Sequence, residues 1–88
     1  MTEFEENIFK KAIEKYGAEA QEEVAQEECA ELIHAISKKH RGNPNNIEEE
    51  IADAEIMIEQ LKIINCCEND VKEIRKQKIE RLGRNVEV

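Results

Sequence analysis

The chain contains almost nothing that would interrupt a helix. Its 88 residues include one proline and three glycines. All of its acidic residues except Asp53 and Asp70 are glutamates, and glutamate fits a helix interior better than aspartate, whose short side chain competes for backbone hydrogen bonds. The hydrophobic content of 40% is too high for a disordered acidic segment. The sequence therefore predicts a small all-α protein.

Helix breakers and capping residues divide the chain into four predicted helices. The expected helices span about residues 2–15, 18–40, 46–64 and 70–82. Asn46 and Asp70, each followed three residues later by a glutamate, are expected to cap the last two helices, and Gly83 is expected to end the fourth. No repeat or linker divides the chain. We therefore expect residues 1–88 to form a single domain built as an antiparallel helix bundle.

Charge excludes several classes of partner. A net charge of −8 opposes binding to phosphate backbones, and only three aromatic residues are available to stack on bases. The first residues are acidic where a secretory signal peptide would be basic. Acidic residues also interrupt the most apolar stretch well before the roughly 20 residues that a bilayer requires. We expect a cytoplasmic protein with neither a nucleic-acid nor a membrane partner.

The three cysteines, Cys29, Cys66 and Cys67, do not form a recognisable framework. Their number is odd, two are adjacent, and no Cys-x-x-Cys spacing occurs. We expect three reduced thiols, with Cys29 as a small core residue.

Four acidic residues stand out by orientation. At 100° per residue, Glu28 falls inside the apolar arc of helix 18–40 and Glu31 lies at the edge of that arc. On helix 46–64, Glu50 lies in the middle of the apolar stripe, and Asp53 flanks it. Two antiparallel helices would bring these carboxylates together, whereas most of the other glutamates are expected to be surface charges.

Such a cluster requires a neutralising group. Buried carboxylates are costly, and neighbouring like charges raise each other's pKa. Neither inner arc contains Lys or Arg, whereas a hard divalent cation with oxygen ligands fits a set of carboxylates. The cluster contains no His or Cys, which argues against zinc and favours Mg²⁺, with Mn²⁺ as a substitute.

These residues carry a family resemblance. The chain has Glu-Glu-x-x-Glu at residues 27–31 and, after eighteen residues, Glu-x-x-Asp at residues 50–53. In this pair of motifs it resembles the compact MazG-like, all-α nucleoside triphosphate pyrophosphohydrolases. The resemblance implies a Mg²⁺-dependent enzyme that splits a nucleoside triphosphate into a monophosphate and pyrophosphate, with the bundle fold of that family.

The resemblance also implies residue roles. Glu28, Glu31, Glu50 and Asp53 would bind the metal. Glu27 would bind metal or help to position the attacking water, which makes Glu27 and Glu28 the expected catalytic residues. No nucleophilic side chain is needed, because metal ions that bridge the phosphates supply charge neutralisation and lower the pKa of a bound water.

A second, weaker element lies near the C-terminus. Lys78-Ile79-Glu80-Arg81 is similar to a Lys-aromatic-x-Arg-Arg element that contacts phosphates in longer family members. The resemblance implies that Lys78 and Arg81 bind substrate. Ile79 replaces the aromatic residue and Leu82 stands in place of the second arginine, so these two side chains could equally be solvated helix charges.

Two other functions are compatible with parts of the sequence. One is a noncatalytic helical interaction protein that binds a structural metal. The other is a di-iron site, because Glu31 and His34 have Glu-x-x-His spacing. A second such motif is missing, since Ser37 stands three residues before His40, and we expect His34 at the surface.

The third predicted helix is apolar on two sides. Ala52, Ile56 and Ile63 form a strip roughly opposite Glu50. A helix that is apolar on two sides is buried on two sides, which a chain this short cannot easily achieve alone. We therefore expect a homodimer or homotetramer in which subunits meet at this strip.

Overall fold

The computed structural model describes residues 1–86 and contains four helices. They are α1 (Glu3–Tyr16), α2 (Ala18–His40), α3 (Ile47–Ile64) and α4 (Glu68–Val86). No strand occurs among residues 1–86, and none of these helices is long and apolar enough to cross a bilayer. The predicted all-α, four-helix chain is therefore confirmed.

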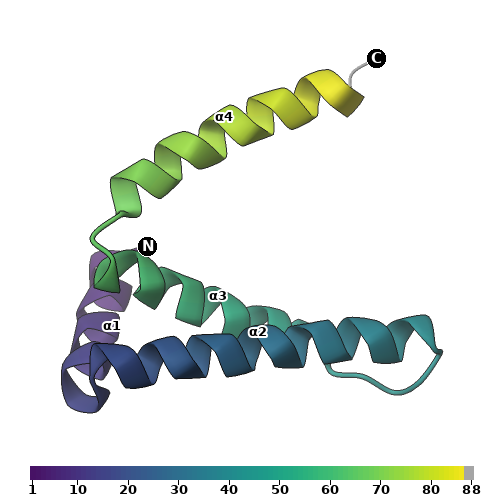
Figure 1. The fold of residues 1–88 in the computed structure, drawn as a ribbon, viewed down its shortest axis with the longest axis horizontal. Helices are drawn as coiled ribbons and strands as arrows, with labels where there is room; N and C mark the ends of the chain where they lie inside the picture. The colour runs from purple at the N-terminus through teal and green to yellow at the C-terminus, as the bar shows by residue number, and fades with distance from the viewer. Residues whose placement is uncertain (87–88) are drawn as a thin grey trace.

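Three of the helices pack together and the fourth projects away from them (Figure 1). Helices α2 and α3 form a long antiparallel hairpin, and α1 lies across the end at which α2 begins and α3 ends. Helix α4 touches α3 close to their connection and packs against neither α1 nor α2. Within one chain, α4 does not complete a closed bundle.

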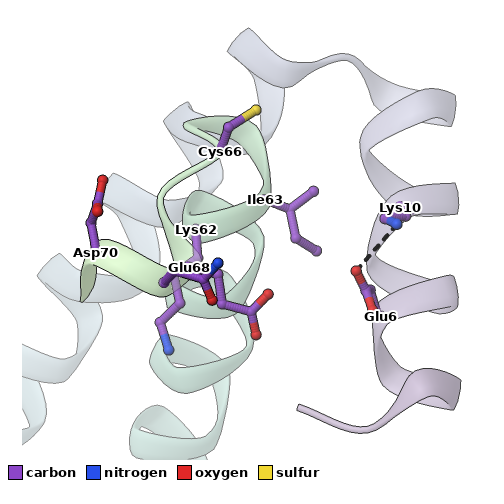
Figure 2. A pocket seen from close by; sticks show the side chains of 8 residues that line it. Glu6, Lys10, Lys62, Ile63, Cys66, Glu68 and Asp70 are labelled. Carbon is purple, nitrogen blue, oxygen red and sulfur yellow. Dashed lines mark ion pairs between the residues drawn. The ribbon is translucent and has the colours of Figure 1, made fainter. Parts of the chain in front are cut away.

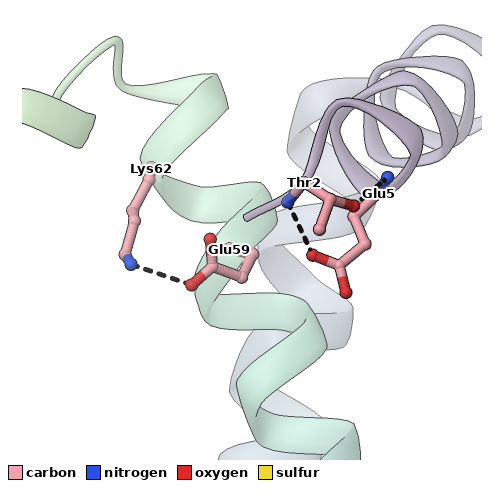
Figure 3. A network of polar contacts seen from close by, with 4 residues as sticks. All are labelled: Thr2, Glu5, Glu59 and Lys62. Carbon is pink, nitrogen blue, oxygen red and sulfur yellow. Dashed lines mark hydrogen bonds and ion pairs between the residues drawn. The ribbon is translucent and has the colours of Figure 1, made fainter.

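Helix α1 begins with a full capping box (Figure 3). The Glu5 amide donates to Thr2 Oγ1 at 3.1 Å, and the Thr2 amide donates to Glu5 Oε1 at 2.9 Å. These two bonds satisfy amides that the first turn would otherwise leave unpaired. At the other end, Gly17 adopts a φ of 92°, which lets the chain turn directly into α2.

A Schellman turn ends α2. Gly42 has a φ of 72°, its amide donates to the Lys39 carbonyl at 3.0 Å, and the Asn43 amide donates to the Lys38 carbonyl at 2.9 Å. Residues 41–46 then lead into α3. The short connection holds α2 and α3 as antiparallel neighbours.

The predicted capping role of the Asn46 side chain is wrong. Asn46 occupies the N-cap position, but its side chain accepts no backbone hydrogen bond. Its amide nitrogen Nδ2 instead donates to Glu50 Oε1 at 2.9 Å, while Asn45 Oδ1 accepts from the Ile47 amide at 3.2 Å. The Asn46 side chain is held by the Glu50 carboxylate, one turn into α3. The side chain of Asn45, rather than that of Asn46, therefore caps the first backbone amide of the helix.

The predicted bounds of the last helix are also wrong. Helix α4 begins at Glu68 rather than after a cap at Asp70, and it continues through Gly83. A Schellman turn ends α3, with Cys66 at a φ of 49° and the Cys67 amide donating to the Lys62 carbonyl at 3.0 Å. Because that turn is complete at Cys67, the next helix starts immediately.

The core between α2 and α3 is built largely from small side chains. Ala25, Ala35 and Ala54 are 3%, 2% and 3% exposed, and Met57 is 5% exposed. The alanines let the two backbones approach closely, while Met57 fills the remaining space. Cys29, expected to be a core residue, is only half-buried, and so are the apolar side chains of Val24, Leu32 and Leu61.

A buried polar pair, not expected from the sequence, joins the same two helices. Gln21 and Gln60 are 7% and 4% exposed, and Gln21 Nε2 donates to Gln60 Oε1 at 2.7 Å. Gln60 Nε2 also lies 3.6 Å from Met57 Sδ. Since each amide satisfies part of the other's hydrogen-bonding capacity, the pair fixes the register of α2 against α3.

The apolar strip on the far side of α3 is only partly covered. Ala52 and Ile56 are exposed, whereas Ile63 is half-buried and lies beside α1. The three cysteines have free thiols, and Cys66 is exposed.

Candidate metal centre

Three carboxylates converge between α2 and α3. Glu28, Glu50 and Asp53 each offer one ligand atom, and these atoms all lie within 4.8 Å of one another. Glu28 comes from the middle of α2, and the other two come from the first two turns of α3. The convergence expected from the helical angles is present for these three residues.

Small buried neighbours bring the two helices together at this point. Ala35 lies two turns after Glu28 on α2, and Ala54 lies one turn after Glu50 on α3. Both alanines are almost fully buried in the helix interface, so their faces lie against the opposite helix. The carboxylates on the same faces therefore project into the space between the helices.

Glu50 is the most constrained member of the cluster. Its Oε1 accepts the hydrogen bond from Asn46 Nδ2, whereas its Oε2 is buried and has no hydrogen-bond partner. A buried, unpaired carboxylate oxygen carries a large desolvation cost, which a directly bound cation would offset. This orphaned oxygen is a second observation, independent of the acidic composition, that points to a ligand.

The electrostatics of Glu28 indicate the same need. Burial raises the pKa of the Glu28 carboxyl above its ordinary value, and the charges of Asp53, Glu50 and Glu31 raise this pKa further. A hydrogen bond with Asp53 acts in the same direction. All of these influences disfavour the ionised form, and no basic side chain opposes them. A divalent cation would reverse the balance.

The remaining members of the predicted set lie at the edge of the cluster or outside it. Glu31 is exposed; its charge raises the pKa of Glu28, but Glu31 is not among the three converging ligands. Glu27 is also exposed and lies outside the cluster. Lys78 and Arg81 are exposed on α4, which does not pack against α2, so this chain does not bring them to the carboxylates.

Asn46 is the site residue that sequence reasoning missed. Its amide holds one oxygen of Glu50, so it orients a proposed ligand from one turn away. The available signal was the spacing of four residues between them, which places the two side chains on one helix face. His34 is exposed, as expected, and does not belong to the carboxylate set.

A separate polar pocket lies where α1, α3 and the start of α4 meet (Figure 2). It contains the Glu6–Lys10 ion pair, with Lys10 Nζ 3.2 Å from Glu6 Oε1. The pocket is lined by both charge types and by apolar atoms: Glu6, Lys10, Lys62, Ile63, Cys66, Glu68, Asn69 and Asp70. None of the three converging carboxylates lines it, so it is distinct from the candidate metal centre.

The donor chemistry of the cluster fits a hard divalent cation. All three converging side chains are carboxylates on helices, which suits a hard divalent cation better than a soft metal. Comparison with known proteins identifies no relative, because no protein family, curated protein or solved structure matches the chain.

Proposed function

We propose that this protein is a Mg²⁺-dependent nucleoside triphosphate pyrophosphohydrolase that releases a nucleoside monophosphate and pyrophosphate. One observation carries the proposal. Glu28, from the first motif, meets Glu50 and Asp53, both acidic residues of the second motif, in one cluster, and Glu50 has a buried oxygen with no hydrogen-bond partner. This arrangement supports metal binding, and the resemblance of the paired motifs to MazG-like enzymes supports the reaction.

Glu28, Glu50 and Asp53 would hold the cation, and Glu31 would complete the set when substrate binds. When bound, Mg²⁺ neutralises the phosphate charge and increases the acidity of a coordinated water. The chain itself supplies position. Glu50 is oriented by Asn46, and Glu28 is half-buried on α2, which packs against α3 through alanines. Glu27, at the solvent side of α2, would help to orient the attacking water.

Lys78 and Arg81 on α4 are the proposed substrate-binding residues. Both side chains are cationic and accessible, which suits phosphate recognition. Helix α4, however, projects from the body of the same chain. For these residues to bind substrate held at the carboxylates, α4 would need to act at the site of a neighbouring subunit or to change its position.

The decisive experiment is a pyrophosphate-release assay. Purified protein is incubated with a panel of ribo- and deoxyribonucleoside triphosphates in the presence of Mg²⁺, and the products are identified. We expect a monophosphate and pyrophosphate from at least one substrate, with Mn²⁺ as a substitute and with no product when EDTA is present.

Matched variants connect the activity to the cluster. Glu28→Gln and Glu50→Gln each remove a charged ligand without changing side-chain shape, and we expect each to lower kcat by roughly 100-fold or more. Glu48→Gln, on an exposed position of α3, should leave kcat unchanged. Metal binding without hydrolysis of any substrate would instead favour the alternative, a noncatalytic helical protein with a structural metal.

A further inference from the structure

The turn between α3 and α4 is formed without glycine. It consists of residues 65–67, and the chain has no glycine or proline between Pro44 and Gly83. The left-handed residue of the turn is Cys66, with a φ of 49°. A residue with a Cβ adopts this conformation at a cost in free energy, so glycine or asparagine usually occupies such a position. The turn is therefore formed by a residue that does not favour it.

Few contacts hold α4 in its position. No residue of α4 is buried, and the helix packs against α3 alone. Near the connection, Ile58 and Glu59 share a pocket with Val71 and Arg75. Farther along, the two helices diverge (Figure 1). The angle between α3 and α4 thus depends mainly on the three residues that join them.

The apolar faces of α3 and α4 share one helical phase. Positions that alternate in steps of three and four residues lie on one face of a helix. One such series runs from α3 through the connection into α4 without interruption: Ala54, Met57, Leu61, Ile64, Glu68, Val71, Arg75, Lys78 and Leu82. Its first two members are buried between α2 and α3, and its last four line the apolar face of α4. Two helices joined by a turn need no common phase, whereas a single helix requires one.

The turn also leaves backbone amides unpaired that a continuous helix would pair. The first hydrogen bond of α4 runs from the Val71 amide to the Cys67 carbonyl at 2.9 Å, so the amides of residues 68–70 precede it. In a helix that ran through the connection, these three amides would donate to the carbonyls of residues 64–66. The sequence of the connection is thus compatible with a second conformation.

We propose that residues 65–67 are a hinge with two states. One state is the turn of this structure. In the other state the hinge is helical, and α3 and α4 form one straight helix over residues 47–86. The turn keeps the contacts of Val71 and Arg75 with α3, whereas the straight state releases Cys66 from the left-handed conformation and pairs three more amides. These opposing contributions place the two states close in free energy. The hinge does not require the hydrolase activity.

The state of the hinge sets the distance between α4 and the candidate metal centre. In the straight state Lys78 lies 25 residues after Asp53 on one helix, a separation of about 37 Å. That separation is too large for both side chains to bind one nucleotide within a chain. In the turn state α4 runs back beside the hairpin (Figure 1). The hinge would therefore control which surfaces the basic side chains of α4 can reach.

The first test measures the distance between two exposed positions, one on each helix. Glu48→p-acetylphenylalanine and Glu80→p-acetylphenylalanine are coupled to nitroxides through the ketone, which leaves the cysteines unmodified. Double electron–electron resonance is recorded on labelled protein diluted with unlabelled protein, so that distances within one chain are measured. We expect two components, a shorter one from the turn and one near about 48 Å from the straight helix.

Substitutions at Cys66 should shift the two components in opposite directions. Cys66→Gly removes the cost of the left-handed conformation and weakens a helical hinge, whereas Cys66→Ala strengthens a helical hinge. The ratio of long to short component should differ between these variants by roughly tenfold or more. Gly83→Ala, within α4, is the control and should leave the ratio unchanged. Absence of the long component from Cys66→Ala, or equal ratios in the two Cys66 variants, would overturn the proposal.

The second test follows the amides of residues 68–70 without any label. Their hydrogen exchange is measured by NMR in the unaltered chain and in both Cys66 variants. Because these amides are paired only in the straight state, Cys66→Ala should slow their exchange several-fold and Cys66→Gly should accelerate it. The Ala54 and Met57 amides, in the packed hairpin, serve as the reference. Equal exchange of residues 68–70 in the three proteins would show that the hinge has one state.

Discussion

The α2–α3 hairpin and α4 are all helical, yet they differ in apolar content and in what they bury. Each of these helices is rich in charge, and α4, with 19 residues, is as long as α3, with 18, but α4 has fewer apolar side chains. The hairpin buries alanines, a methionine and a glutamine pair, whereas no residue of α4 is buried. Helical propensity is sufficient to form the hairpin helices and α4, but only side chains packed between two helices are held in one position. The candidate metal centre lies in the packed hairpin because its carboxylates must be held close together.

The largest expected stability difference between the two regions comes from truncating an apolar side chain. Met57→Ala should lower the free energy of unfolding by about 2–5 kcal/mol, because it leaves a cavity between α2 and α3. Ile79→Ala on α4 should change it by less than about 0.5 kcal/mol in the monomer. Urea denaturation followed by circular dichroism measures both. Equal losses would show that α4 packs against its own chain.

Metal binding should stabilise the hairpin selectively. Mg²⁺ or Mn²⁺ at 100 times its dissociation constant should add about 2.7 kcal/mol to the free energy of unfolding. Asp53→Asn should remove this gain, while Glu55→Gln, an exposed change on the same helix, should preserve it. Thermal melts with and without EDTA provide the measurement. Stabilisation that persists in Asp53→Asn would place the metal elsewhere.

The buried glutamines allow a double-mutant cycle across α2 and α3. Gln60→Leu leaves Gln21 without its partner and should cost about 1–3 kcal/mol. Adding Gln21→Leu should recover much of this loss, because both polar groups are then replaced. Gln77→Leu on exposed α4 is the control, with an expected effect within about 0.5 kcal/mol. Strictly additive losses would mean that the hydrogen bond contributes nothing.

The smallest effect concerns pH. Because the pKa of Glu28 is raised in the folded protein, the metal-free folded state binds more protons than the unfolded state between the ordinary and the raised pKa. The stability of the metal-free protein should therefore fall as pH rises through this window. Glu28→Gln should reduce the fall and make the metal-free protein slightly more stable at neutral pH, whereas Glu80→Gln should not. A steeper fall in Glu28→Gln, measured by thermal melts, would contradict this assignment.

The sequence predicted the helices well because their signals are local. Gly17 and Gly42 act within one turn, and in the structure each adopts a positive φ where a helix ends. The angular position of Glu28 and Glu50 was also sufficient to predict that they meet. These inferences needed only helical geometry and the expectation that two apolar faces pack together.

The features that the sequence did not predict depend on side-chain conformation, on contacts between helices and on the conformation of a single turn residue. Asn46 has the correct position for a cap, but the carboxylate of Glu50 takes its amide group, a choice that depends on side-chain conformation. The Gln21–Gln60 bond depends on the register between two helices, which no pattern within one helix encodes. The position of α4 depends on the left-handed conformation at Cys66, a residue type that rarely signals such a turn.

The order of the helices has a consequence for the rate of folding. Helix α2 packs against both of its neighbours in the chain, and its main partner, α3, follows after residues 41–46. Contacts between neighbouring helices have short sequence separation, so the hairpin should form on a microsecond to millisecond scale.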